Sequence, residues 1–307
     1  MDQSTVWRRT LMKILLLGKN GQVGWELQRS LSYLGEVIAL DFDSKEFCGD
    51  FTQPEKLSAS IKQIKPDIIV NAAAHTAVDL AESEQSLAYQ VNAYTVETIA
   101  KTASQIDAWL IHYSTDYVFS GEGEEPWQED DSPQPNNIYG KSKLLGEQYI
   151  EQYCTKYLIF RTSWVYASRG HNFARTMLKL AQSRESLQVI DDQYGAPTSA
   201  ELLADCTAHA IRIAYEQPKV AGIYHLVASG ETTWFDYAQF IFDFARKQQL
   251  NLTIKNVEAV VSEAFPTPAV RPHNSRLCTN KFEKIFSVKL PCWQFGVTRM
   301  LHEILEK

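Results

Sequence analysis

Short apolar runs alternate with segments of helical periodicity through the first half of the chain. The apolar runs lack the polar–apolar alternation of a half-exposed strand, which is typical of strands buried on both faces. We expect such strands at residues 13–18, 36–40, 67–73, 109–114 and 157–163. Between them, apolar positions recur at helical spacing near residues 23–34, 54–64, 85–105 and 139–153. Strand and helix repeated in this order predict a parallel sheet with helices on both faces.

The second half of the chain is less regular. We expect helices at 172–183 and 232–248, strands at 187–190 and 222–228, and a proline-rich loop at 263–276. We therefore predict an α/β fold, a Rossmann-like doubly wound parallel sheet with a smaller mixed α/β domain. The larger domain is expected at 12–165, with parts of 196–228 returning to it, and the smaller one at 166–195 and 229–307. No Gly/Ser-rich linker separates them, so we expect the two to share an interface.

Composition narrows the possible functions. The chain has 307 residues, 45% of them apolar and 22% charged, which is an ordinary globular balance. Its net charge of −7 argues against a surface for nucleic acid or anionic membrane, because such surfaces need an excess of clustered Lys and Arg. The longest apolar runs are far shorter than the roughly 20 residues of a membrane span. Residues 1–11 have no apolar segment typical of a signal peptide and are left out of the fold prediction.

Cysteine and histidine usage points to neither a disulfide framework nor a metal centre. The cysteines are odd in number, widely scattered and never spaced C-x-x-C: Cys48, Cys154, Cys206, Cys278 and Cys292. The seven histidines form no H-x-x-x-H pair, so a catalytic metal is not predicted. We expect reduced thiols and a cytoplasmic protein.

The segment "GKNGQVG" carries three glycines, Gly18, Gly21 and Gly24, between the first strand and the first helix. Glycine at such a turn lets the backbone approach a pyrophosphate, which the helix N-terminus then faces. The segment predicts a dinucleotide site. Taken alone, it is also compatible with a simple tight turn.

Two acidic segments follow the second strand. Asp41 is placed where a carboxylate can accept hydrogen bonds from the adenosine ribose hydroxyls. Asp43 would repel a 2′-phosphate and Lys45 would attract one, so the sequence leaves NADH and NADPH open. Asp50 and Phe51 are candidates for covering the adenine, although an ordinary turn explains them equally well.

Tyr139 and Lys143 are one helical turn apart, so both side chains should face the same way beside the dinucleotide. A nearby ammonium favours the phenolate, so we expect Lys143 to lower the pKa of Tyr139. The phenol could then exchange a proton with a carbonyl oxygen. A hydroxyl at the end of the fourth strand would complete the set, and Ser114 and Thr115 are both candidates. Each feature is weak alone, but their order along the chain makes coincidence improbable.

These residues resemble the extended short-chain dehydrogenase/reductases. The resemblance extends from about Lys13 to the C-terminus. It rests on the segments "GKNGQVGWELQ", "VNAAAHTAVDLAE", "HYSTDYVF", "YGKSKLLGE", "RTSWVYA", "NFARTML", "DDQYGAPT" and "RPHNSRL". It implies that the larger domain binds the dinucleotide and the smaller one the substrate.

The resemblance also implies site residues. The catalytic set would be Thr115, Tyr139 and Lys143, with Thr115 preferred because the family pattern is S-T-D-Y. The cofactor-binding residues would be Gly18, Asn20, Gly21, Gln22, Val23, Asp41, Asp50, Phe51, Ala74, His75, Thr76, Tyr113, Tyr139 and Lys143. The substrate-binding residues would be Thr115, Asp116, Tyr117, Trp164, Gln193 and Tyr194. Without the resemblance, we would interpret Trp164 as a core residue and residues 191–198 as a structural loop.

Within the family, several segments are similar to reductases of a deoxysugar nucleotide. The implied reaction is reduction of the C4 ketone of dTDP-4-dehydro-L-rhamnose by NADPH or NADH, the last step of dTDP-L-rhamnose synthesis for cell-surface polysaccharide such as O-antigen. Dehydratases of the family carry T-D-E, but Tyr117 stands at the third position here. Epimerases lack "DDQYGAPT". Two alternatives stay open: a reductase or 3,5-epimerase/reductase acting on another nucleotide keto sugar, and a non-catalytic subunit like the regulatory partner of methionine adenosyltransferase.

The resemblance further suggests a homodimer. Some relatives hold Mg²⁺ at a carboxylate-rich subunit face, and Glu26, Glu201 and Glu303 are conceivable contributors, although their spacing does not require a metal. The acidic run at 122–131 is expected to be a solvated loop.

Overall fold

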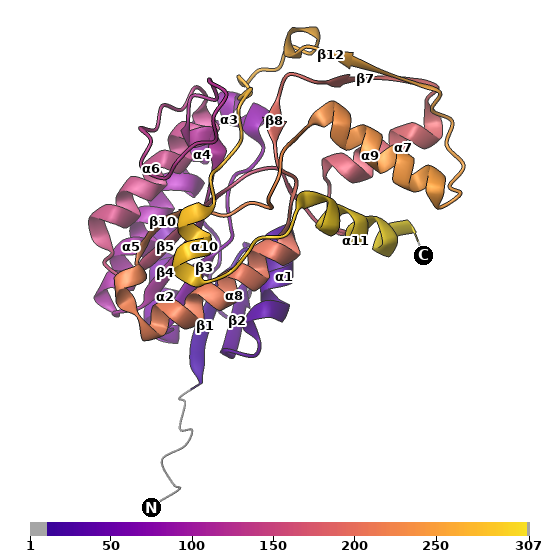
Figure 1. Cartoon of the computed structure of the whole chain (residues 1–307). Helices are drawn as coiled ribbons and strands as arrows, with labels where there is room; N and C mark the ends of the chain where they lie inside the picture. Colours follow the sequence, from indigo (N-terminus) through magenta and orange to yellow (C-terminus); the bar gives the residue numbers. More distant parts are fainter. Residues whose placement is uncertain (1–10, 306–307) are drawn as a thin grey trace, which may run out of the picture.

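The computed structural model describes residues 11–305, so residues 1–10 of the segment set aside above lie outside it. The chain forms two lobes (Figure 1). The elements of the larger lobe are β1 (Met12–Leu17), α1 (Gln22–Leu31), β2 (Gly35–Leu40), α2 (Pro54–Ile64), β3 (Ile68–Asn71), α3 (Val78–Ser83), α4 (Gln85–Tyr89), η2 (Gln90–Tyr94), α5 (Thr95–Gln105), β4 (Trp109–Thr115), η3 (Asp116–Val118), α6 (Ile138–Tyr153), β5 (Tyr157–Thr162), α8 (Ala200–Glu216), η4 (Pro218–Val220), β10 (Gly222–His225) and α10 (Asn280–Phe286).

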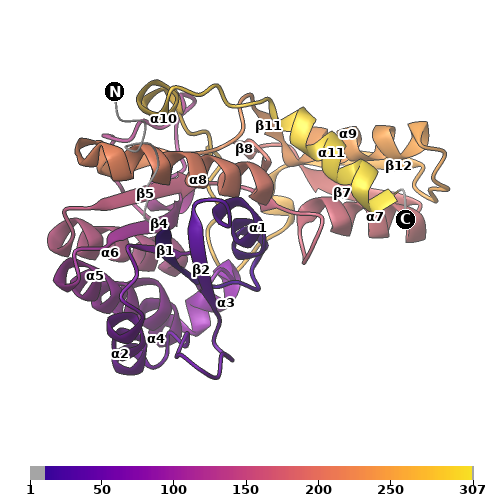
Figure 2. The same ribbon diagram turned by 90° about the horizontal axis from the view of Figure 1, so that it is seen from below.

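The central sheet has the strand order β2–β1–β3–β4–β5–β10, and every neighbouring pair is parallel. Successive side chains of β1 enter two different cores: Ile14 and Leu16 pack with α1 and α8, whereas Leu15 and Leu17 pack with α2 and α5. Figure 2 shows these helices above and below the strands. Each fully buried aliphatic side chain contributes about 1.5–3 kcal/mol. Burial on both faces explains the uninterrupted apolar run and confirms the predicted Rossmann-like fold.

The order of the strands locates a ligand crevice. The strand order reverses at β1, which lies between β2 and β3. The connection from β1 runs to β2 at one edge of the sheet, whereas the connection from β3 runs to β4 in the opposite direction. In open α/β sheets, such a reversal opens a crevice at the carboxyl ends of the two strands. Here those ends are followed by residues 18–24 and 72–77.

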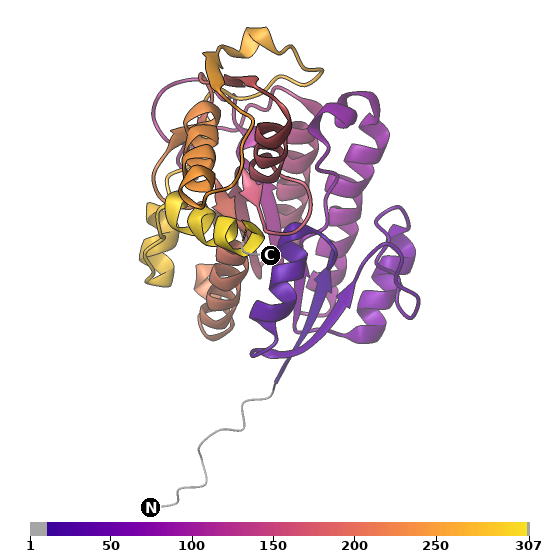
Figure 3. The ribbon, with the colours of Figure 1, turned by 90° about the vertical axis from the view of Figure 1, so that its right-hand side faces the viewer.

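The smaller lobe lies beside the larger one and faces the viewer in the side view of Figure 3. Its elements are α7 (Phe173–Ser183), β7 (Ser186–Ile190), β8 (Tyr194–Gly195), β11 (Thr232–Thr233), α9 (Trp234–Lys247), β12 (Asn256–Val260), η5 (Ser262–Ala264) and α11 (Trp293–Leu305). The two-stranded pair β6 (Val165–Tyr166) and β9 (Thr198–Ser199) joins the lobes. The core of the smaller lobe contains Leu178, Tyr237, Phe242 and Trp293.

One segment lies where the sequence did not place it. Residues 280–286 were assigned to the smaller domain, but Phe282 and Phe286 of α10 pack in the core of the larger lobe, next to Tyr224 of β10. We therefore propose the predicted domain division with α10 returned to the larger lobe.

The helix predicted at 85–105 is interrupted by the π-helical turn η2. Within this turn, the buried Asn92 amide accepts from the backbone N–H of His75 at 2.9 Å and donates to its carbonyl at 3.1 Å. The same amide donates to Ser142 of α6. A π-turn re-aims one side chain of a helix, and here it ties the loop after β3 to the helix that carries Tyr139.

Candidate active site

The glycine turn after β1 is present as predicted, but its three glycines are required for different reasons. Gly18 has φ +84°, and a Cβ there would lie 2.7 Å from the backbone nitrogen of Ala73. A Cβ on Gly24 would lie 1.9 Å from the Gly18 carbonyl oxygen. Both positions therefore need glycine for the fold itself.

Gly21 is different, since a Cβ there would meet only ordinary contact, 3.5 Å from the Gly18 oxygen. Gly21, Gln22 and Val23 line a cavity of about 410 Å³ between the ends of β1 and β3. Hydroxyls of Ser114, Thr162 and Ser163 also line this cavity and are buried without a hydrogen-bond partner. Buried polar atoms of this kind point to a polar ligand, so the crevice fits a dinucleotide.

We expect Gly21→Ala to keep the fold and weaken dinucleotide binding. Its backbone is extended, at φ −67°, which alanine adopts readily, so stability should change by less than about 1 kcal/mol. The methyl group would occupy the position where the backbone must approach the pyrophosphate, so the dissociation constant for NADPH should rise about tenfold or more. Fluorescence titration measures it. An unchanged constant would contradict this role, and Gly24→Ala is the contrasting variant that should disturb folding.

The residues predicted for the adenosine end fall into two groups. Asp41 lies at the turn, where its carboxylate accepts from the backbone N–H of Asn20 at 2.9 Å and of Phe42 at 2.8 Å. Asp50 accepts from Thr52 and Gln53 at the start of α2, and the Phe51 ring is buried in the core. In this structure their side chains are engaged in local hydrogen bonds and packing, and a contact of Asp50 and Phe51 with the adenine stays a prediction.

The predicted catalytic residues do come together. Thr115, Tyr139 and Lys143 all line the crevice cavity. The Thr115 hydroxyl donates to Asp116 Oδ1 at 3.0 Å and hydrogen-bonds the Tyr139 phenol. Ser114, the competing candidate, has no such contact. The Tyr117 ring lies edge-on to Tyr139, with centroids 5.5 Å apart.

The expectation that Lys143 lowers the pKa of Tyr139 is wrong for this structure. Burial raises the pKa of Tyr139, and the hydrogen bond with Thr115 opposes the rise only in part. Lys143 Nζ is instead directed at the carbonyl oxygen of Tyr113, 2.5 Å away, and at His112. A buried phenol of raised pKa is a proton donor at neutral pH.

Asp116 lies behind Thr115 and is 2% exposed. Burial raises the pKa of its carboxyl to about 6, against hydrogen bonds from Ser275 and Thr115. The folded state therefore holds this proton more tightly than the unfolded chain does. Stability from this group is fully present below the unfolded pKa, near 3.8, and is lost as the pH rises through about 6.

We therefore expect Asp116→Asn to gain stability relative to the natural protein as the pH rises. The relative gain between about pH 4 and pH 7 should reach about 2–3 kcal/mol. Urea unfolding at several pH values measures it. The exposed Asp130→Asn is the matched control and should show no such trend. A difference independent of pH would contradict the expectation.

Only some of the residues predicted for the nicotinamide side line the crevice cavity. Ala74, Thr76 and Tyr113 line the cavity. The Tyr113 hydroxyl hydrogen-bonds Thr207 of α8 at 2.6 Å. The His75 ring lies 3.3 Å from Glu84, away from the lining, whereas its backbone is fixed by Asn92.

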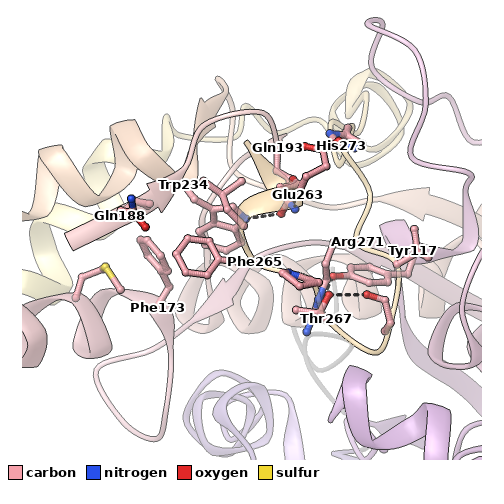
Figure 4. Close-up of a pocket in the computed structure, with 17 residues that line it drawn as sticks. Tyr117, Phe173, Gln188, Gln193, Trp234, Glu263, Phe265, Thr267, Arg271 and His273 are labelled. Atoms are coloured by element: carbon pink, nitrogen blue, oxygen red, sulfur yellow. Dashed lines mark hydrogen bonds between the residues drawn. The ribbon is translucent and has the colours of Figure 1, made fainter. Parts of the chain in front are cut away.

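We call residues 262–273 the strap. A second cavity of about 520 Å³ lies between the strap and the smaller lobe. Figure 4 shows Phe173, Trp234 and Phe265 at one end and Arg271 with Tyr117 at the other. Tyr117 lines both cavities, so they adjoin at the side chain next to Tyr139. An aromatic end and a cationic end suit a base and a diphosphate.

Of the remaining predicted substrate residues, two line a cavity and one does not. Trp164 lines the crevice, with its indole stacked on Trp234 at 3.6 Å. Gln193 lines the second cavity, accepts from Trp234 Nε1 and donates to Ser262. Tyr194 is 40% exposed under the Arg276 guanidinium and is absent from the described lining of both cavities.

Sequence reasoning missed the contact that fastens the strap. Arg271 donates to Asp79 of α3 at 2.6 Å and to the Tyr117 hydroxyl at 3.1 Å. Asp79 also accepts from the backbone of Ala269, and Asn137 donates to the carbonyl of Val270. Both partners stand in segments that carry the family resemblance, "AVDLAE" and "RPHNSRL", but nothing local pairs residues so distant in sequence.

The structure gives no support for a metal. Within residues 11–305, no three His, Cys, Asp or Glu side chains are arranged to hold an ion. Burial raises the pKa of Glu201, and Arg299, which pairs with it at 3.1 Å, opposes the rise. Glu26 and Glu303 make smaller contributions that raise it. All five cysteines are free thiols. None of the helices in the described part of the chain is long and apolar enough to cross a membrane.

Comparison with known proteins gives one consistent result. The family model described as RmlD substrate binding domain matches residues 12–306. The dTDP-4-dehydrorhamnose reductase of Escherichia coli K12 is 61% identical over 293 residues, covering 95% of this chain and 98% of that protein. The reductase of the same name from Burkholderia thailandensis is 41% identical over 96% of this chain and all of that protein.

Solved structures agree. A dTDP-4-dehydrorhamnose reductase from Bacillus anthracis, in complex with NADP, superposes with a TM-score of 0.85 at 33% identity, covering 95% of this chain and 99% of that one. A UDP-glucose 4-epimerase from Thermus thermophilus, in complex with NAD, gives a TM-score of 0.78 at 18% identity, with coverage of 95% and 99%, which shows the fold alone.

Proposed function

The chain belongs to the dTDP-4-dehydrorhamnose reductase family of the extended short-chain dehydrogenase/reductases, and from this premise we propose that it reduces the C4 ketone of dTDP-4-dehydro-L-rhamnose to give dTDP-L-rhamnose. The observation that carries the proposal is the position of Tyr139. Its phenol lies in the crevice beside Thr115, where that cavity adjoins the second one. A keto sugar whose nucleotide occupies the second cavity would bring its carbonyl towards this phenol.

NADPH or NADH, when bound, would supply the hydride. The residues of the chain would supply the rest: the turn at Gly21 would hold the pyrophosphate, and Lys143 would hold the nicotinamide ribose. The Thr115 hydroxyl polarises the carbonyl oxygen, where negative charge develops. Tyr139, which burial keeps protonated, donates its proton to that oxygen.

The second cavity is proposed to recognise the nucleotide. Phe173, Trp234 and Phe265 offer aromatic faces for the base, and the Arg271 guanidinium offers paired donors for the diphosphate. The proposal includes Asp116, Tyr117, Trp164 and Gln193 as neighbours of the sugar and leaves the role of Tyr194 to experiment.

The wider setting is also a proposal. Free, scattered thiols support a cytoplasmic protein, and family membership supports a homodimer. Asp41 and Asp43 disfavour a 2′-phosphate while Lys45 favours one, so both nicotinamide cofactors are retained. Magnesium is not required by the proposed chemistry.

A coupled assay tests the function. The keto sugar nucleotide is made enzymatically from dTDP-glucose, and the loss of nicotinamide absorbance is followed with NADPH and with NADH. The expected result is turnover of this substrate ahead of a panel of other nucleotide keto sugars. Preference for another member of the panel would change the substrate, and no oxidation of either cofactor with any keto sugar would favour the non-catalytic alternative.

A further inference from the structure

The side-chain amide of Asn137 makes two hydrogen bonds that join separate parts of the molecule. Asn137 is 4% exposed and stands directly before α6, where its Oδ1 accepts from the backbone N–H of Gly140 at 2.8 Å. Its Nδ2 donates to the carbonyl of Val270 in the strap at 2.9 Å. One side chain therefore caps the helix that carries Tyr139 and also holds the strap.

The two bonds fix the amide in a single orientation. The backbone N–H of Gly140 can only donate and the carbonyl of Val270 can only accept, so the amide NH₂ group must face the strap. Capping alone does not require an amide, because Asp and Ser cap helices about as well as asparagine does. In the same chain, Ser199 caps α8 and Thr233 caps α9 through their hydroxyls. What distinguishes Asn137 is therefore the donor that it offers to the strap.

The same part of the strap is also held from α3. The backbone N–H of Ala269 donates to Asp79 Oδ1 at 3.3 Å, and Arg271 Nη2 donates to Asp79 Oδ2 at 2.6 Å. The side chain of Val270, between these two residues, is 62% exposed, so Val270 is held through its backbone. Its carbonyl is the point at which the start of α6 holds the strap.

The start of α6 is fixed on its other sides by close contacts. A Cβ on Gly140 would lie 2.1 Å from the carbonyl oxygen of Tyr117, so the helix touches the backbone of η3 directly. The backbone N–H of Ile138 donates to Glu82 of α3 at 2.8 Å. Tyr139 follows Ile138 in the first turn of α6, so the contacts that place this turn also place the phenol.

We propose that Asn137 is a positioning residue that seats the strap against the start of α6, so that the cavity for the sugar nucleotide closes onto the helix end that carries Tyr139. The effect of this seating on turnover rests on the proposed function. The seating itself does not, because it can be measured without any substrate.

Two substitutions remove the donor to the strap and keep the cap. Asn137→Ser caps with its single oxygen and has no second polar atom, and the ionised carboxylate of Asn137→Asp caps but cannot donate to Val270. The bond from the backbone N–H of Ala269 to Asp79 forms only when the strap is seated. This N–H should therefore exchange with deuterium about tenfold faster in both variants, as amide exchange followed by NMR in the whole protein measures.

The kinetic effect of both variants should fall on KM. Only a seated strap places Arg271 for the diphosphate, so the apparent affinity for the keto sugar nucleotide falls with the seated fraction. We expect KM to rise about tenfold. The bound nucleotide itself closes the strap, so kcat should stay within about twofold. Asn137→Ala removes the cap as well, which frees the first turn of α6, and should lower kcat in addition.

Asn136→Asp is the matched control, because it makes the same substitution one position earlier in the chain. The amide of Asn136 is exposed and donates at 2.7 Å to the carbonyl of Ser120, which lies outside the strap. Amide exchange at Ala269 and KM should both stay within about twofold of the natural protein. Asn137→Ser introduces no charge, so it separates the lost donor from the added charge and covers the case in which Asn137→Asp fails to fold.

Unchanged exchange at Ala269 in Asn137→Ser would overturn the proposal. Faster exchange with an unchanged KM would overturn the positioning role, because the bond to the strap would then be structural only. Equal effects in Asn136→Asp would assign them to charge and would also contradict the proposal. If the natural protein reduces no keto sugar, the proposed function fails, and the exchange experiment still decides whether Asn137 seats the strap.

Discussion

Replacing Tyr139 with phenylalanine is expected to lower kcat by about 10²–10⁴-fold, which is the usual contribution of a positioned general acid. The ring would keep its packing against Tyr117, so only the proton donor is removed. Because the glycine turn and Lys143 are untouched, the dissociation constant for NADPH should stay within about twofold. Steady-state kinetics and fluorescence titration together give this split between chemistry and binding.

A matched variant shows whether the loss belongs to the site. Tyr237 is also a buried tyrosine, but it lies in the core of the smaller lobe, and its hydroxyl has no hydrogen-bond partner within the described residues. Tyr237→Phe should leave kcat nearly unchanged. Equal turnover in Tyr139→Phe and the natural protein would remove Tyr139 from the mechanism.

Arg161→Met is expected to lower the free energy of unfolding by about 3–5 kcal/mol, because it leaves Glu147 charged and unpaired in the core. The side chains of this pair are 3% and 1% exposed, and Arg161 Nη2 donates to Glu147 Oε2 at 2.7 Å. Arg161 Nη1 also donates to the Glu129 carbonyl, and the guanidinium covers the Phe119 ring. Urea unfolding at neutral pH measures the loss.

The double variant Arg161→Met with Glu147→Leu removes both charges and should recover most of that stability. A surface pair provides the comparison: Arg246→Met breaks an exposed ion pair with Asp243 and should cost less than about 1 kcal/mol. If Arg161→Met costs no more than Arg246→Met, the buried pair is not the constraint described. Because Glu147 stands on α6, the pair also anchors the helix that carries Tyr139.

The sequence predicted those parts of the site that depend on local patterns. The glycine turn and the pair Tyr139 and Lys143 each follow from a short segment whose element type is readable from hydrophobic periodicity. Local patterns left Ser114 and Thr115 both open, and only the family resemblance favoured Thr115. The sheet and its connectivity follow from the alternation of strand and helix.

Long-range partners could not be predicted in the same way. Asp79 and Arg271 are 192 positions apart in the sequence. Asn71 lies opposite His112 only because β3 pairs with β4. The effect of burial on Tyr139 depends on every element around it, which explains why reasoning from Lys143 alone gave the wrong sign. For α10, a Phe-x-x-x-Phe spacing indicates a buried helical face without saying which lobe buries it.

The path of the chain between the lobes has a consequence during synthesis. The polypeptide leaves the sheet after β5, forms α7 and β7 of the smaller lobe, returns to place β10 beside β5, and leaves again. Until β10 emerges from the ribosome, the edge of β5 has no neighbour. The strap emerges later still, so a nascent chain carries its glycine turn and Tyr139 well before it has a closed place for the sugar nucleotide.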